Sequence, residues 1–278
     1  MSRNGTGASS ATGGGCPQLL RVGIVSASRA PRGAAKKSDA AREGGVGIRV
    51  CEEDCVARRN GISSWVIVVE AGPPSRELYR SVRFYRGLVQ AGLPLRNGTE
   101  PIGWSAADLI KELSMAIASI SGPTLIVGCG QLDEDTEALI LELGRLPCYR
   151  ALIGHRWLRR DPELFSRVAR GWSYCQVNSG ETGSLHTAKA ALEFQRRLAH
   201  FSIRDGGDSG LLWADGRWFR IEGPTVQAAD EATTGDLFGT AYTVARHFRR
   251  AGAREAVRYA ERVVEECNQG RDVPRYAC

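Results

Sequence analysis

A carboxylate beside an expected helix start is the first feature of this sequence that suits a reactive site. Residues 228–240 contain a Thr-rich loop with one glycine that leads to Asp236, and apolar residues recur at helical spacing from Leu237 to Phe248. A helix start leaves N–H groups unpaired at the positive end of the helix dipole, where phosphate binds. Asp236 is therefore a candidate base for an attacking hydroxyl, and the alternative is that it only caps the helix.

Two earlier loops also combine residue types that suit phosphate or metal chemistry. Asn178 and Glu181 follow an apolar run, and their oxygen atoms suit a hydrated Mg²⁺. The alternative is an ordinary helix start with a glutamate in its first turn. Residues 205–210 form a Gly-rich turn, which lets the backbone approach a nucleotide but also occurs in plain tight turns.

The elements that must position these loops alternate between strands and helices from residue 101 onward. We expect helices, from apolar residues at helical spacing, over 105–119, 135–143, 161–169 and 187–199. We expect strands, from short apolar runs, at 123–128, 150–154, 172–177 and 201–203. This alternation predicts a parallel sheet with helices on both faces, which binds ligands beyond the carboxyl ends of its strands.

The first hundred residues are harder to interpret. Apolar runs predict strands at 19–25, 46–50 and 64–70, and residues 76–84 are expected to return as a partner strand. We interpret 46–85 as lid-like strands that project beyond the main sheet. The alternative is that these strands continue the main sheet.

The domain organisation is simple. Residues 1–18 are rich in Gly, Ser and Thr and are expected to form a disordered tail, which leaves one α/β domain over 19–278. Within that domain a hairpin over 211–221 is expected to turn at Asp215 and Gly216.

Composition limits the partners. The net charge is +6, from 37 basic and 31 acidic residues, and the isoelectric point is near 9.0, which favours anionic partners. The basic residues are scattered and show neither zinc-finger spacing nor an aromatic–basic RNA signature, so no nucleic-acid partner is expected. No apolar run is long enough to span a bilayer, and no membrane partner is expected.

Cysteine usage indicates a reducing compartment. The chain has eight cysteines and no secretory signal, which is typical of free thiols in the cytoplasm. No acidic residue precedes Asp39, and the alternative is therefore an organellar transit segment. Cys51 and Cys55 form a pair, but no second pair completes a zinc site.

Taken in order, the three loops resemble the motifs of the PfkB carbohydrate kinase family. The matching segments are Asn178-Ser179-Gly180-Glu181, then Asp205-Gly206-Gly207-Asp208-Ser209-Gly210, and then Asp230-Glu231-Ala232-Thr233-Thr234-Gly235-Asp236. The resemblance implies a ribokinase-like three-layer α/β/α sandwich with a mainly parallel central sheet and a small β lid. It also implies an ATP-dependent kinase that phosphorylates a hydroxyl of a sugar or sugar-like small molecule with the help of Mg²⁺.

The resemblance gives each matched residue a role. It implies that Asp236 is the catalytic base, that Thr233, Thr234 and Gly235 form the anion hole, that Asn178 and Glu181 organise Mg²⁺, and that Asp205, Gly207 and Gly210 lie along ATP. A homodimer through the lid strands is a further expectation.

The sequence also departs from the family pattern. Thr233 and Thr234 replace a glycine and an alanine of that pattern, and Glu231 replaces a threonine. A β-branched residue restricts backbone angles that glycine permits. The family's N-terminal sugar-binding motif has no counterpart here. The alternative function is therefore a catalytically weak or inactive PfkB-like protein that acts as a nucleotide-binding or protein-interaction module.

Overall fold

The structure is a computed structural model. It describes residues 18–26, 56–57, 59–71, 79–84, 110–111, 114–115, 118, 124–129, 140–153, 167–179, 187–196, 198–205, 209–224, 231–272, 274 and 276. Of the expected tail over 1–18, only Gln18 is described, and it lies in a strand. The expected strand at 46–50, the cysteine pair Cys51 and Cys55, and the candidate residues Glu181 and Gly207 lie outside the described residues.

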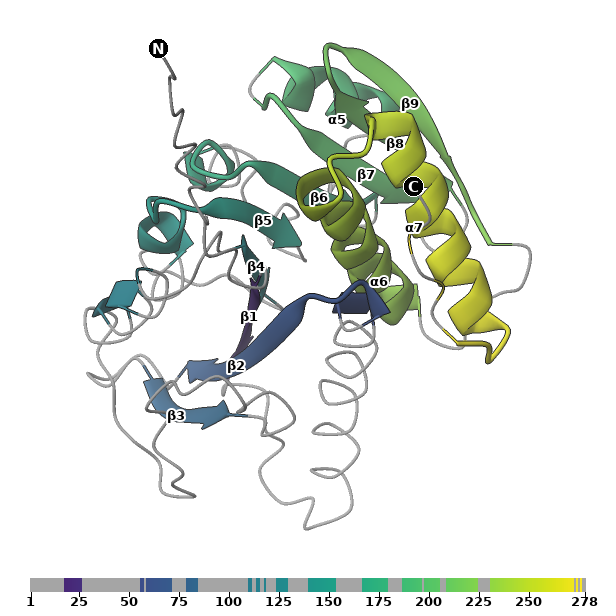
Figure 1. Ribbon diagram of the computed structural model, residues 1–278. Helices are drawn as coiled ribbons and strands as arrows, with labels where there is room; N and C mark the ends of the chain where they lie inside the picture. Colours follow the sequence, from purple (N-terminus) through teal and green to yellow (C-terminus); the bar gives the residue numbers. More distant parts are fainter. Residues whose placement is uncertain are drawn as a thin grey trace, which may run out of the picture.

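A mixed sheet forms the centre of the fold (Figure 1). Its strands, β1 to β9, span Gln18–Ser26, Ser63–Ala71, Tyr79–Phe84, Thr124–Cys129, Tyr149–Ile153, Tyr174–Asn178, Phe201–Asp205, Ser209–Ala214 and Arg217–Glu222. Within the described residues their order is β3-β2-β1-β4-β5-β6-β7-β8-β9. The six strands from β2 to β7 in this order are parallel, while β3, β8 and β9 run antiparallel to their neighbours. The expectation of a mainly parallel sheet is confirmed.

The N-terminal strands lie in this sheet. β1 pairs with β2 on one side, where Leu20 is opposite Trp65, and with β4 on the other, where Leu20 is opposite Leu125. The interpretation of 46–85 as lid strands that project beyond the sheet is therefore wrong for β2 and β3, and the alternative is correct. The physical reason is the unbroken apolar run of β2, because a strand without polar alternation is typical of a buried parallel position.

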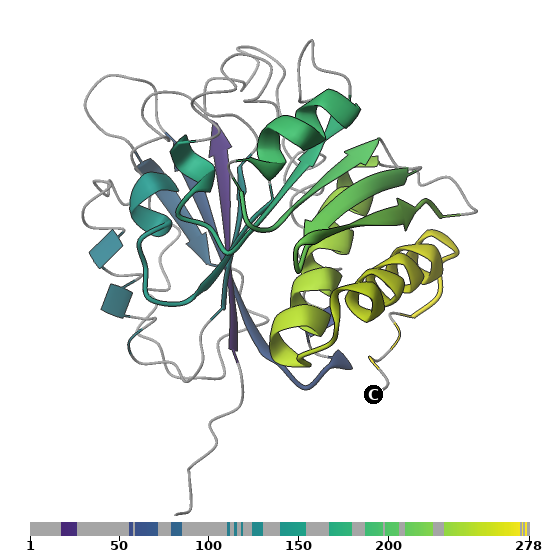
Figure 2. The same ribbon diagram turned by 90° about the horizontal axis from the view of Figure 1, so that it is seen from above.

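Helices cover both faces of the sheet (Figure 2). Two residues of β7 show which helix covers which face. Phe201 of β7 contacts Phe194 of α5 (Thr187–Gln195), with ring centroids 5.9 Å apart. Arg204 lies on the opposite side of the strand, 4.6 Å from the ring centre of Phe238 in α6 (Glu231–Thr243). Because neighbouring positions on a strand point to opposite faces, α5 and α6 lie on different sides of the sheet.

Most of the expected elements are confirmed. The described residues within the helices expected over 105–119, 135–143 and 161–169 are helical. The hairpin of β8 and β9 turns at Asp215 and Gly216, whose φ angles of 53° and 72° match a type I′ turn. None of the helices among the described residues has the length and apolar character needed to cross a membrane.

α6 begins earlier than the sequence predicts. The expected helix follows Asp236, whereas the structure places the start at Glu231. The reason is local: Glu231 and Ala232 favour the helix, and the threonines that stand in place of small residues lack the backbone freedom to hold an irregular loop. At its other end α6 continues as a π turn, η5 (Val244–Phe248), in which Arg249 N–H donates to the Val244 carbonyl at 3.2 Å.

The last helix, α7 (Ala253–Asn268), packs along α6 as an amphipathic element (Figure 1). Its buried residues recur at helical spacing and include Ala256, Ala260, Val263 and Val264. These side chains and the sheet-facing residues of α6 belong to the hydrophobic core under the carboxyl half of the sheet. This core holds α6 in place against β5 and β6.

Candidate active site

The end of β6 is the structural base of the candidate site. Tyr174, Gln176 and Asn178 alternate along the strand, so their side chains share the face that α6 covers. Gln176 is 2% exposed, and its side-chain amide donates a hydrogen bond of 2.6 Å to the Gly235 carbonyl. The strand that ends at Asn178 is thereby joined directly to the helix that carries Asp236.

A close contact between helix and sheet makes this hydrogen bond possible. A β-carbon placed on Gly239 would lie 2.8 Å from Ile153 Cδ1 and 3.0 Å from Gln176 Oε1. Any side chain at this position would therefore push α6 away from β5 and β6. Gly235 and Gly239 are one turn apart and lie on the same side of α6.

A buried polar network continues from Gln176 into the layer between sheet and helix. The Tyr174 hydroxyl donates to Gln176 Oε1 at 3.1 Å and lies 2.6 Å from the Ser202 hydroxyl. One turn beyond Phe238, the Tyr242 hydroxyl lies 2.7 Å from His200 Nε2. Burial, reinforced by the charge of Arg246, lowers the pKa of His200 to about 4, so this imidazole is neutral at physiological pH.

Asp236 lies in the second turn of α6 and is 4% exposed. Its neighbour Gly235 contacts the end of β6, since a β-carbon on Gly235 would lie 3.6 Å from Asn178 Oδ1. The structure thus brings two of the expected site residues, Asp236 and Asn178, to the same junction. This junction is at the carboxyl end of a parallel strand, where sheets of this type bind ligands.

The early start of α6 places the residues expected to form the anion hole inside the helix. In a helix that begins at Glu231, the N–H groups of Gly235 and Asp236 donate to carbonyls one turn earlier. Thr233 and Thr234 lie in the first turn of this helix. The side chain of Thr234 is buried at 1% exposure. An anion hole formed by Thr233, Thr234 and Gly235 stays a prediction.

The Gly-rich turn after β7 has only part of its expected residues in the described chain. Asp205 is exposed, and its carboxylate accepts a hydrogen bond from the Ser179 hydroxyl, which joins this turn to the end of β6. Gly210 has a structural explanation, because a β-carbon there would lie 2.5 Å from the Ile203 carbonyl across the hairpin. The expected nucleotide contacts of Asp205, Gly207 and Gly210 stay predictions.

The donor atoms at the end of β6 suit a hard cation. Asn178, Ser179 and Asp205 offer amide, hydroxyl and carboxylate oxygens, the ligand type that Mg²⁺ prefers. Within the described part of the chain no three or more His, Cys, Asp or Glu residues group together as a metal cage. Mg²⁺ commonly binds proteins through one or two carboxylates and keeps several of its water ligands.

Three contributors to this region have no counterpart in the motifs. Gln176 and Gly239 bring α6 to the sheet, and Arg204 places a buried cation beneath α6 at 1% exposure. A signal for Gln176 exists in the sequence, namely a polar residue inside an apolar parallel strand. Gly239, four residues after Gly235, is a second such signal. Nothing in the sequence marks Arg204, whose contact with the Phe238 ring depends on the packing of α6.

Comparison with known proteins shows the fold. No family model matches the sequence, and no curated protein matches it. A protein assigned as ribokinase II from E. coli, in complex with ATP and Mg²⁺, is similar in structure at 12% identity and a TM-score of 0.53, over 93% of this chain and 96% of that one. A pyrophosphate-dependent myo-inositol-1 kinase, converted by two substitutions into a myo-inositol-3 kinase, is similar at 16% identity and 0.51, over 89% and 91%. A ribokinase from Thermotoga maritima matches at 13% and 0.50, over 90% and 92%.

The chain therefore has the ribokinase-like α/β fold, as its sequence motifs imply. At these identities the likeness concerns the fold, and the chemistry of the site has to be argued from the chain's own residues.

Proposed function

We propose that this chain is an ATP-dependent, Mg²⁺-assisted kinase of the PfkB family that phosphorylates a hydroxyl of a sugar or sugar-like small molecule. The observation that carries the proposal is the buried carboxylate of Asp236, on α6 where this helix meets the end of β6. The names of structurally similar proteins support it, since they include a ribokinase and a myo-inositol kinase.

In this proposal Asp236 takes the proton of the attacking hydroxyl while the new O–P bond forms and ADP leaves. Mg²⁺, when bound, would neutralise part of the negative charge of the phosphates. Asn178 and Asp205, together with Glu181, would hold the ion or its waters, and the phosphoryl group would be bound near the start of α6, at the positive end of the helix dipole. The hydrogen bond from Gln176 to Gly235 fixes the position of Asp236 relative to this edge of the sheet.

A second function is favoured by a specific observation. Because α6 starts at Glu231, the amides of Gly235 and Asp236 are paired within the helix, and the phosphate contacts of an anion hole are reduced. A chain of this kind could bind a nucleotide or a protein partner and transfer phosphate slowly or not at all. The experiment therefore has to distinguish binding without phosphoryl transfer from kinase activity.

The test is a search for phosphoryl transfer over a panel of sugars, polyols and nucleosides. ATP and pyrophosphate are compared as donors, because one of the similar proteins is pyrophosphate-dependent. We expect a phosphorylated product from at least one acceptor with ATP and with Mg²⁺ present, and none when EDTA removes the metal. Binding of ATP without transfer to any acceptor would support the second function instead.

A further inference from the structure

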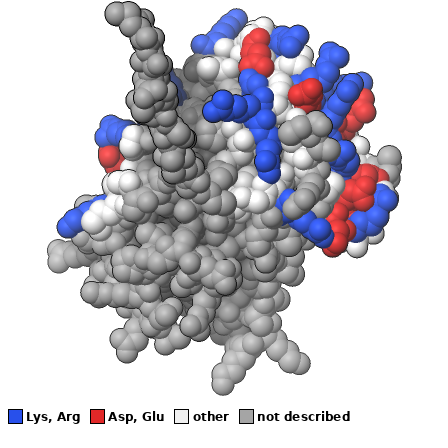
Figure 3. Space-filling view, in the orientation of Figure 1, with Lys and Arg blue, Asp and Glu red and all other residues white. Residues whose placement is uncertain are grey.

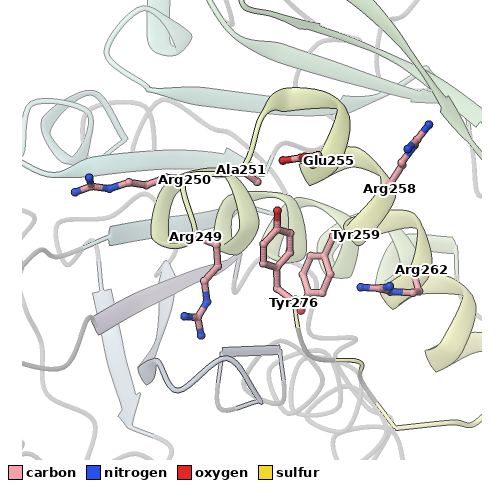
Figure 4. A pocket seen from close by; sticks show the side chains of 8 residues that line it. All are labelled: Arg249, Arg250, Ala251, Glu255, Arg258, Tyr259, Arg262 and Tyr276. Carbon is pink, nitrogen blue, oxygen red and sulfur yellow. The ribbon is translucent and has the colours of Figure 1, made fainter. Parts of the chain in front are cut away.

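A pocket with a strongly basic lining lies where η5 leads into α7 (Figure 4). Its volume is about 440 Å³, which is in the range of small-molecule sites. Four arginines and one glutamate line it, namely Arg249, Arg250, Arg258, Arg262 and Glu255. Since a helix rises about 1.5 Å per residue, the pocket lies roughly 20 Å from Asp236 along α6. It is therefore separate from the candidate active site.

The positive charge of this pocket is only partly neutralised by the protein. The Glu255 carboxylate accepts a hydrogen bond from the Gly252 amide at 3.3 Å and serves as part of the cap of α7. Within the part of the chain that the structure describes, the guanidinium groups of Arg250 and Arg258 form no hydrogen bond or ion pair. Burial raises the pKa of Glu261, and the charge of Arg258 nearby opposes this effect. On the face that Figure 3 draws, basic and acidic side chains of the described residues are interspersed. The pocket departs from that mixture.

The backbone at Arg250 points to a role for its side chain. Arg250 has a φ of 55°, in the left-handed region, directly after the end of a helix. Glycine is the common residue at such a position, because a β-carbon is disfavoured there. The preceding π turn is another uncommon conformation, and π turns occur frequently at functional sites. The left-handed backbone conformation therefore gives no reason for an arginine at this position.

The inner wall of the pocket is already fixed. Tyr259 is 2% exposed, and its hydroxyl accepts a hydrogen bond of 2.8 Å from Asn60 and donates one of 3.1 Å to the Pro274 carbonyl. Asn60 also accepts a hydrogen bond of 3.2 Å from the Tyr276 amide. The rings of Tyr259 and Tyr276 meet edge to face, with centroids 5.2 Å apart. Because these contacts already hold the two tyrosine side chains in place, they lose little conformational entropy when a ligand binds.

We propose that this pocket binds a small ligand that carries several phosphoryl groups. Guanidinium groups bind phosphate oxygens in pairs of parallel hydrogen bonds. In Figure 4 the arginines spread outward around the two tyrosine rings and do not converge on one point. A single phosphate would reach only part of this set, whereas a ligand with spaced phosphoryl groups reaches more of it. This binding does not depend on phosphoryl transfer at Asp236.

The test is titration calorimetry of the full chain with inorganic tripolyphosphate and with inorganic phosphate as probes. We expect tripolyphosphate to bind and phosphate to bind at least about tenfold more weakly. Arg258→Gln and Arg250→Gly should each reduce tripolyphosphate affinity by about tenfold or more. Arg254→Gln is the matched control, because Arg254 is exposed on the same helix and does not line the pocket. It should leave affinity unchanged.

Arg250→Gly also separates binding from folding. Glycine suits a positive φ, so this variant should unfold at the same temperature as the wild type or a higher one while it loses affinity. Equal tripolyphosphate affinity in the wild type and Arg258→Gln would overturn the proposal. The proposal is also overturned if a single-stranded oligonucleotide or polyglutamate binds in an Arg258-dependent manner while tripolyphosphate does not.

Discussion

The side-chain amide of Gln176 donates a hydrogen bond to the main-chain carbonyl of Gly235 across 2.6 Å. This contact fixes the register between β6 and α6, and with it the position of Asp236 relative to Asn178. Gln176 was not among the expected site residues, and Gly235 was expected only to contribute to the anion hole. The relationship shows that the candidate site depends on how closely one helix approaches one strand.

Gln176→Leu should lower the free energy of unfolding by about 1–3 kcal/mol, because it removes a buried hydrogen-bonding group from a network that includes Tyr174. Urea denaturation measures the change. Gln269→Leu, at the exposed end of α7, is the control and should alter stability by less than about 0.5 kcal/mol. Equal effects of the two substitutions would mean that the Gln176 hydrogen bond does not contribute to the free energy of unfolding.

The two glycines of α6 should respond oppositely to alanine. A β-carbon on Gly235 would make only ordinary contacts, at 3.5 Å and 3.6 Å, so Gly235→Ala should stabilise the helix by about 0.5–1 kcal/mol. Gly239→Ala should destabilise it by up to about 2 kcal/mol, because the new methyl group would overlap Ile153 and Gln176. Thermal unfolding of both variants decides this, and stabilisation by Gly239→Ala would refute the close approach of α6 to the sheet.

His200 should make stability depend on pH. Burial and the charge of Arg246 lower its pKa to about 4 in the folded protein, from 6.5 in the unfolded chain. Both states carry a neutral imidazole above pH 6.5, and as the pH falls from 6.5 to 4 only the unfolded chain takes up the proton. The free energy of unfolding should therefore decrease by up to about 1.4 kcal/mol per pH unit in this window.

His200→Gln isolates this contribution from that of the carboxylates, since glutamine does not titrate and can still bond to the Tyr242 hydroxyl. The difference in stability between wild type and variant should vary with pH between 6.5 and 4, and be constant above 7. A difference that stays constant over the whole range would show that His200 takes up its proton equally in both states.

The order of elements could be predicted from the sequence because it depends on local patterns. Apolar runs identified the strands from β4 to β7, and Asp215 with Gly216 identified the hairpin turn. The placement of β2 and β3 was wrong, since the partner of a strand is decided by contacts with residues far away in the chain. β2 is paired with β1, and residues 27–62 separate these two strands in the sequence.

The candidate site could be predicted only in part. Asp236 and Asn178 were identified by type and order, and the structure places them at one junction. The start of α6 at Glu231 was not predicted, because glycine-to-threonine differences change backbone freedom and motif order does not record this. Arg204 was not predicted either, since a buried cation becomes visible only when the aromatic ring that covers it is in place.

Asp236 is the residue on which the proposed phosphoryl transfer depends most directly. The decisive measurement is kcat for the best acceptor, compared between wild type, Asp236→Asn and Asp215→Asn. Asp215→Asn is the same substitution, made in the exposed hairpin turn, and serves as the control. We predict that Asp236→Asn lowers kcat by about a hundredfold or more while ATP still binds, and that Asp215→Asn leaves kcat within about twofold. Equal kcat in wild type and Asp236→Asn would contradict the proposed role.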